Sequence, residues 1–157
     1  RLFQSHASIL HRFVEGNCIH WLSLQLGYAL HRRSLAAEEH EVSTNDNPYN
    51  DEVHLIFVAL DAFYRQCPQL LLNEDSIHRN GSQVLRLSRA ALVHDSMRQQ
   101  QGISQPIISI WHSFSACNLG TTLLLQNPET LRIVNTILSA MKRKFHHQNY
   151  NLLQESF

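Results

Sequence analysis

The chain has 157 residues, of which 43% are hydrophobic and 17% are charged, and its 13 Lys and Arg balance 13 Asp and Glu. This length and apolar content suffice for one globular domain with its own core, which argues against wholesale disorder. Zero net charge removes the attraction on which non-specific binding to nucleic acids and anionic membranes depends. No apolar run reaches the roughly 18 residues that cross a bilayer. We therefore expect neither nucleic-acid binding nor membrane insertion by this segment.

The first predicted helical region covers residues 3–33, where apolar side chains recur every three or four positions. Gly16 and Asn17 interrupt this pattern and predict a division into two helices, because glycine costs about 1 kcal/mol inside a helix. Trp21, in the second of these helices, is expected to be a core anchor. Residues 42–50 are polar and predict a connection between helices.

The next helix is predicted from 53 to 66, with one wide apolar face. Asn50 is expected to cap its first turn, and the helix should stop ahead of Pro68 because the residue before a proline disfavours helical geometry. The polar residues 73–81 predict a turn. Ser82 then has the residue type expected of a cap for a further helix.

Pro106 is expected in the first turn of a helix that runs to Leu125 and is apolar nearly all round, which predicts a central position. Residues 107–110 could form a short strand, but no partner strand is available and the flanking pattern is helical. Asn127 and Pro128 predict the cap and first turn of a last helix.

Together these elements predict an all-α fold, an irregular bundle of five or six helices in a single domain that spans residues 1–157. Because both ends lie within sequence that looks structured, we expect the chain to be a fragment of a longer protein. The predicted core consists of Phe57, Leu60, Trp111, Phe114, Leu123, Ile137 and Leu138.

Residue types that carry chemistry give no recognisable pattern. Cys18, Cys67 and Cys117 are far apart and odd in number, which favours reduced intracellular thiols over a disulfide framework. His20 follows Cys18 by two residues, so their side chains point to different sides of a helix and do not form a zinc site. Cys117 is expected inside an apolar helix, with low reactivity. Asp61 and the pair at 74–75 lack the spacing of an acid and a base. We expect no catalytic residue, metal site or cofactor, and therefore no enzyme.

Four segments between Glu52 and Phe145 follow one another in a distinctive order. An aromatic-rich helix ends in a basic residue and a proline (Arg65 and Pro68), and a capped helix follows. A proline-led apolar helix with small residues in its middle comes next, before a last amphipathic helix. The segments are HLIFVALDAFYRQCPQLL, SQVLRLSRAALVHDSMRQQ, PIISIWHSFSACNLGTTLLL and NPETLRIVNTILSAMKRK. This order resembles the C-terminal half of the fungal-specific transcription factor regulatory domain.

The resemblance implies a nuclear regulatory domain that acts through a protein partner or a small hydrophobic effector, without catalytic residues. Regulators of this family carry six closely spaced cysteines in a zinc cluster that binds DNA, and the three cysteines here are scattered. DNA recognition is therefore expected outside this segment. Two alternatives are a small helical enzyme or hydrophobic-ligand binder, and a helical interaction module of unrelated ancestry such as a secreted effector. A polar cluster converging in a pocket would favour the former, and an exposed apolar groove the latter.

Overall fold

The computed structural model describes residues 2–40, 48–94 and 101–135. Within these ranges the chain forms helices and no strand, so the all-α prediction is confirmed. The same ranges contain eight α-helices, more than the five or six predicted, and residues 128–135 are also helical. The helices are α1 (Leu2–Glu15), α2 (Cys18–His40), α3 (Asn50–Gln66), α4 (Pro68–Leu71), α5 (Glu74–Ser76), α6 (Ser82–His94), α7 (Gln101–Ser115) and α8 (Asn118–Leu125), with a π-helical turn η2 (Ile77–Gly81) between α5 and α6.

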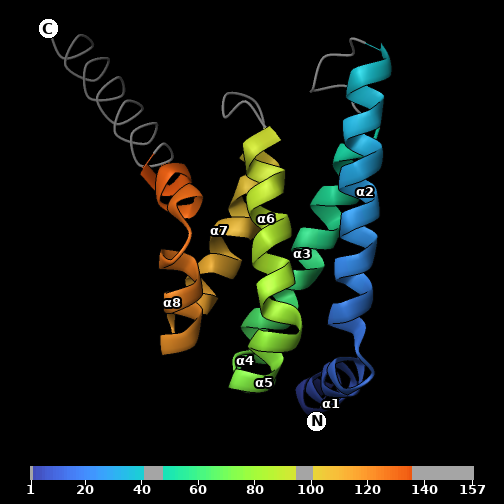
Figure 1. Ribbon diagram of the computed structural model, residues 1–157. Helices are drawn as coiled ribbons and strands as arrows, with labels where there is room; N and C mark the ends of the chain where they lie inside the picture. The colour runs from blue at the N-terminus through green and yellow to red at the C-terminus, as the bar shows by residue number, and fades with distance from the viewer. Residues whose placement is uncertain (1, 41–47, 95–100, 136–157) are drawn as a thin grey trace, which may run out of the picture.

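The break between α1 and α2 lies where the sequence predicts it. Asn17 adopts a left-handed backbone conformation with φ of 61°, which asparagine tolerates better than most residues. The chain turns there, and α1 lies across the end of α2 (Figure 1). The predicted cap of α3 is wrong, because Asn50 is already the first helical residue and the preceding Tyr49 makes no side-chain capping bond.

An ion pair joins α2 to the beginning of α3. One guanidinium nitrogen of Arg32 lies 2.7 Å and 2.9 Å from the two carboxylate oxygens of Glu52. The same guanidinium lies over the ring of Tyr49, 5.1 Å from its centroid. Most of the predicted polar connection 42–50 falls outside the described residues, and its last residue belongs to α3.

The segment after α3 is helical where the sequence predicts a polar turn. The side chain of Asn73 accepts a hydrogen bond from the backbone N–H of Ser76 at 2.9 Å, which caps α5. From Glu74 the chain continues through η2 into α6 without leaving helical geometry. Ser82 is therefore a residue within a helix rather than a cap, and its backbone is right-handed helical. The prediction failed because Asn73 supplies the helix start nine residues before Ser82.

The predicted helix from Pro106 to Leu125 is wrong at its start and in its middle. Helix α7 begins at Gln101, so that Pro106 lies inside it, and it ends at Ser115. Cys117 has an extended backbone, and its sulfur accepts a hydrogen bond from the N–H of Gly120 at 3.4 Å, which caps α8. Cys117 thus lies at a helix break and not inside an apolar helix.

A close approach between α7 and α8 explains this break. A Cβ atom added at Gly120 would lie 2.2 Å from the carbonyl oxygen of Phe114, so only glycine fits this position. The first turn of α8 folds back against the end of α7 as a result.

The core lies where α3 packs against α7, with α2 and α6 packed against these helices. Phe57, Leu60, Trp111 and Phe114 are buried, as predicted, and Leu123 is half-buried against the same core. Ile137 and Leu138 lie outside the described residues. The rings of Tyr64 and Phe114 lie 4.9 Å apart, which joins the two central helices through an aromatic pair.

The buried indole N–H of Trp111 has a specific partner on α6. It donates a hydrogen bond to the hydroxyl of Ser88 at 2.8 Å, and that hydroxyl donates to the carbonyl of Leu85 at 2.8 Å. Because an unpaired buried N–H is costly, Ser88 allows a tryptophan at this position in the core.

Candidate functional site

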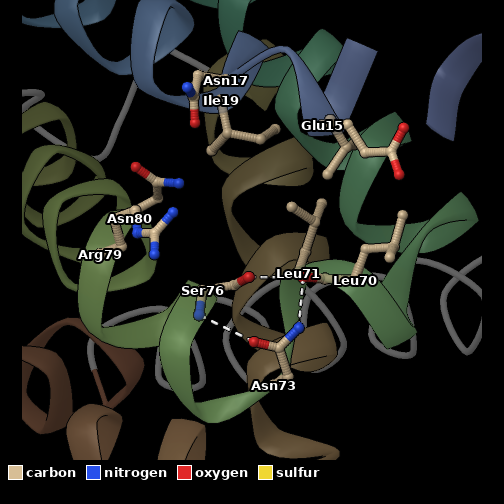
Figure 2. Close-up of a pocket in the computed structure, with 10 residues that line it drawn as sticks. Glu15, Asn17, Ile19, Leu70, Leu71, Asn73, Ser76, Arg79 and Asn80 are labelled. Atoms are coloured by element: carbon tan, nitrogen blue, oxygen red, sulfur yellow. Dashed lines mark hydrogen bonds between the residues drawn. The ribbon is translucent and has the colours of Figure 1, made fainter. Parts of the chain in front are cut away.

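A cleft opens between the junction of α1 with α2 and the segment from α4 to η2. Its volume is about 240 Å³, and Asn17 and Ile19 line one side of it. Arg79 and Asn80, both on the π-helical turn, line the other side (Figure 2). Pi-helical turns are frequent at functional sites, which makes this cleft the first candidate site.

Two polar side chains that line the cleft are already hydrogen-bonded to the chain itself. Asn73 donates to the carbonyl of Leu70 at 2.8 Å, and the hydroxyl of Ser76 donates to the same carbonyl at 2.7 Å (Figure 2). No His or Cys is among the described residues that line the cleft. Its volume is also below the roughly 300 Å³ at which ordinary ligand pockets begin. The cleft therefore has the features of a surface depression around a helix cap.

The residues considered as metal ligands do not come together. Cys18 is half-buried at the start of α2, and the exposed His20 packs its ring edgewise on Trp21 with 5.9 Å between centroids. Cys117 caps α8. In residues 2–40, 48–94 and 101–135, no three His, Cys, Asp or Glu side chains gather where they could share a metal ion.

Two thiols, Cys18 at the start of α2 and Cys67 at the end of α3, lie where burial disfavours the thiolate form. Burial raises the pKa of the Cys18 thiol, and it raises the pKa of the Cys67 thiol as well. A raised pKa lowers the fraction of thiolate, which is the reactive form. Among the carboxylates, Asp61 is buried and bonds Arg65 at 2.7 Å, whereas Glu74 and Asp75 are exposed in the first turn of α5. One carboxylate oxygen of Asp61 is thus paired with a cation, and among the described residues its other oxygen, Oδ1, is buried without a hydrogen-bond partner.

The outward side of α2 is the second candidate. Trp21, Tyr28 and Leu35 are 62%, 64% and 42% exposed. They are spaced seven residues apart, and two helical turns bring every seventh residue back to nearly the same side. Leu24, half-buried, lies between the first two. We call these four residues, Trp21, Leu24, Tyr28 and Leu35, the outer stripe.

The inward side of the same helix is also apolar. Ile19, Leu26 and Ala29 are fully or almost fully buried, and α2 packs on α3 and α6. Ser23 also lies on this side, and its hydroxyl donates to the carbonyl of Ile19 at 2.8 Å. Helix α2 therefore has two opposite apolar faces, of which the described part of the chain covers one.

The expectation that Trp21 is a core anchor is wrong. Trp21 follows the buried Ile19 by two residues, a rotation of about 200° around the helix, so it points away from the core. Helix α2 also lies at one edge of the molecule, opposite α8 (Figure 1). Sequence reasoning missed Tyr28 and Leu35 altogether. Their seven-residue spacing from Trp21 was the available signal.

Other exposed apolar side chains form shorter groups. Leu55 and Val58 on α3 are 65% and 41% exposed and lie one turn apart. The outer stripe instead spans fifteen residues of α2, from Trp21 to Leu35, about 21 Å along the helix, and includes two aromatic rings. Tryptophan and tyrosine are enriched among residues that dominate binding at protein interfaces. The outer stripe is therefore the stronger candidate for a functional surface.

Comparisons of the chain with protein-family models, with curated proteins and with solved structures find no match. The resemblance to the fungal regulatory domain therefore stays a prediction from the sequence. Among the described helices, none combines the length and the apolar content needed to cross a membrane.

Proposed function

We propose that this chain is a helical protein-interaction domain that regulates transcription by binding a partner protein through the outer stripe of α2. The regulatory role and a nuclear location come from the resemblance to fungal transcription regulators. In this proposal the domain acts by binding rather than by catalysis and makes no contact with DNA. Zero net charge supports the last point, because contacts to phosphates supply most non-specific DNA affinity.

The observation that carries the proposal is the exposure of Trp21, Tyr28 and Leu35 on one side of α2. Large apolar side chains scattered singly over a surface are ordinary, but a continuous row of them is typical of an interaction site. A helix that presents apolar residues at intervals of three, four and seven residues suits docking against another helix or into a groove. The partner gains affinity by removing this row from water.

A hydrophobic-ligand binder and an enzyme fit the described residues less well, whereas a helical interaction module of unrelated ancestry would present the same exposed apolar row. A small hydrophobic effector needs an apolar cavity, whereas the cleft beside η2 is small and rimmed by Asn17, Arg79 and Asn80. An enzyme needs polar groups that converge on one point, and the buried carboxylate of Asp61 is bound by Arg65. Both observations favour an interaction domain.

A transcriptional reporter tests the proposal directly. The chain is fused to an unrelated DNA-binding domain in fungal cells, and the double variant Tyr28→Ser with Leu35→Ser is compared with the parent. We expect the variant to lose most of the change in reporter output that the parent causes. The matched control is Leu55→Ser with Val58→Ser, whose side chains have nearly the same exposure, 65% and 41% against 64% and 42%.

Equal output from the parent and both double variants would contradict the proposal. Thermal unfolding of each purified variant must accompany the reporter, so that a loss of output is not a loss of folding. We expect both double variants to unfold close to the parent, because substitutions at exposed positions usually change stability by less than about 0.5 kcal/mol.

A further inference from the structure

We propose that the partner of the outer stripe is a second copy of this chain, with the two α2 helices packed antiparallel. This inference rests on the proposed function, since it names the occupant of the same surface. It follows from the spacing of the stripe and from the charges at the ends of α2.

The spacing is that of a coiled-coil seam. Trp21, Leu24, Tyr28, His31 and Leu35 follow one another at alternating intervals of three and four residues. These intervals define the a and d positions of a heptad repeat, at which two helices interlock side chains. His31 is exposed like its neighbours, so all five positions lie on the outward side of α2. A seam of this kind is completed by another helix with the same repeat.

An antiparallel arrangement gives a self-complementary register. In this register Leu24 of the first copy lies level with Leu35 of the second copy. By the two-fold symmetry, Leu35 of the first copy then lies level with Leu24 of the second. The same register places Tyr28 level with His31 of the second copy, again twice. The centre of the seam then holds two mixed layers of tyrosine and histidine, flanked on both sides by leucine layers.

The charges at the two ends of α2 favour the same arrangement. The exposed Glu38 of one copy comes level with Trp21 of the second copy, beside His20 and near the start of its helix. The positive end of a helix dipole attracts a carboxylate. A parallel pair would instead place Glu38 beside Glu38, and like charges facing each other across two paired helices are destabilising.

The residues that flank the seam would not repel a second copy by charge or by steric clash. Gln25, Gly27 and Ser34 are uncharged. Arg32 also flanks the seam, but its guanidinium is bonded to Glu52 of its own chain at 2.7 Å. A Cβ added at Gly27 would meet no atom within 4 Å, so there is open space for the backbone of another helix to approach. No row of like charges keeps two stripes apart.

The seam is short, which sets the expected affinity. It runs along one helix of 23 residues and buries less surface than the 1,200–2,000 Å² of a standard interface. We therefore expect a dissociation constant on the order of 10 µM. The chain should be a monomer at nanomolar concentrations and a dimer when concentrated.

Analytical ultracentrifugation of the 157-residue chain over about 1 to 100 µM tests the inference, because this range brackets the expected dissociation constant. The mass should rise from the monomer value of 18.2 kDa towards twice that value. Tyr28→Glu with Leu35→Glu should weaken dimerisation at least tenfold. The control Leu55→Glu with Val58→Glu should dimerise like the parent.

Orientation is tested by a photo-crosslinking amino acid placed at Leu24. In the antiparallel dimer it should react with peptides around Leu35 of the second copy, and a crosslink to the segment around Leu24 itself would overturn the arrangement. A chain that stays monomeric throughout, or equal dimerisation of the stripe variant and its control, would overturn self-pairing. If the chain is monomeric but the reporter still depends on Tyr28 and Leu35, the partner is a different protein and the proposed function stands. If neither assay depends on the stripe, both proposals fail.

Discussion

The two tryptophans of this chain have similar sequence neighbourhoods and opposite surroundings. Trp111 on α7 is 6% exposed and its N–H is bonded to Ser88, whereas Trp21 on α2 is 62% exposed and packs on the exposed His20. Each follows apolar residues at helical spacing. The comparison teaches that spacing identifies the residues that share a side of a helix but does not identify the side that the fold covers.

The exposure of the two tryptophans differs because apolar residues are distributed and covered differently on α7 and on α2. Helix α7 is apolar nearly all round and packs on α3, α6 and α8, so large side chains of this helix, including Ile107, Ile110 and Phe114, are buried. On α2 the rows through Ile19 and through Trp21 are both apolar and lie on opposite sides. Only packing against α3 and α6 decides between them. An uncovered apolar row is then left as a surface available for binding.

The largest expected effect is a difference in the free energy of unfolding between a core substitution on α7 and a substitution on the outer stripe of α2. Phe114→Ala should lower the free energy of unfolding by about 3–5 kcal/mol, because it removes a fully buried ring that packs on Tyr64. Tyr28→Ala, on the outer stripe, should change it by less than about 0.5 kcal/mol. Urea denaturation followed by circular dichroism measures both. A loss of 2 kcal/mol or more in Tyr28→Ala, on the scale of core substitutions, would show that the outer stripe is part of the core.

Two glycines make a second contrast between the crowded interior and open surface. Gly120→Ala should destabilise the chain by about 1–3 kcal/mol or more, since the new Cβ would collide with the carbonyl of Phe114. Gly27→Ala should stabilise it by about 0.5–1 kcal/mol, because the site is open and alanine favours a helix. The midpoints of thermal unfolding should move in opposite directions. Two shifts of the same sign would contradict the geometry of one of these sites.

The hydrogen bond of Trp111 gives a third test. Ser88→Ala leaves the buried indole N–H without its partner and should cost about 1–3 kcal/mol. Trp111→Phe removes the N–H together with the need for a partner, so adding Ser88→Ala to it should cost clearly less. A double-mutant cycle from four denaturation curves measures this coupling. Strict additivity would argue against the Ser88–Trp111 bond.

The smallest expected effect concerns the ion pair between α2 and α3. Glu52→Gln should lower the free energy of unfolding by less than about 1 kcal/mol, because Arg32 and Glu52 are 46% and 37% exposed and solvent screens their attraction. The difference from the parent should shrink further at high salt. Unfolding curves at low and high ionic strength check this, and a salt-independent difference would point to a role other than charge.

Local signals made parts of this fold predictable from the sequence. The break at Asn17 depends on the conformational preference of one residue. The cap at Asn127 likewise depends on its own side chain, which accepts a bond from the N–H of Glu129 at 2.9 Å. The break at Cys117 was missed because its cause is the contact between Gly120 and Phe114, which exists only in three dimensions.

The candidate site was predictable only in part. The seven-residue spacing from Trp21 to Tyr28 and Leu35 is visible in the sequence. The exposure of the outer stripe cannot be seen in the sequence. Trp21 and Ile19 are both apolar, so the pattern fits burial of either residue. Tertiary packing selected Ile19, and the row through Trp21 is exposed among the described residues.

Fluorescence quenching of Trp21 is the most direct test of the claim that the outer face of α2 is free to bind. The variant Trp111→Phe leaves Trp21 as the only tryptophan, because the chain has two. At nanomolar concentration we expect acrylamide to quench Trp21 almost as strongly as free tryptophan. Quenching should fall, and emission should move to shorter wavelength, as the concentration rises past about 10 µM. A strongly shielded Trp21 in the dilute monomer would contradict the account, because the outer stripe would then already be covered by its own chain.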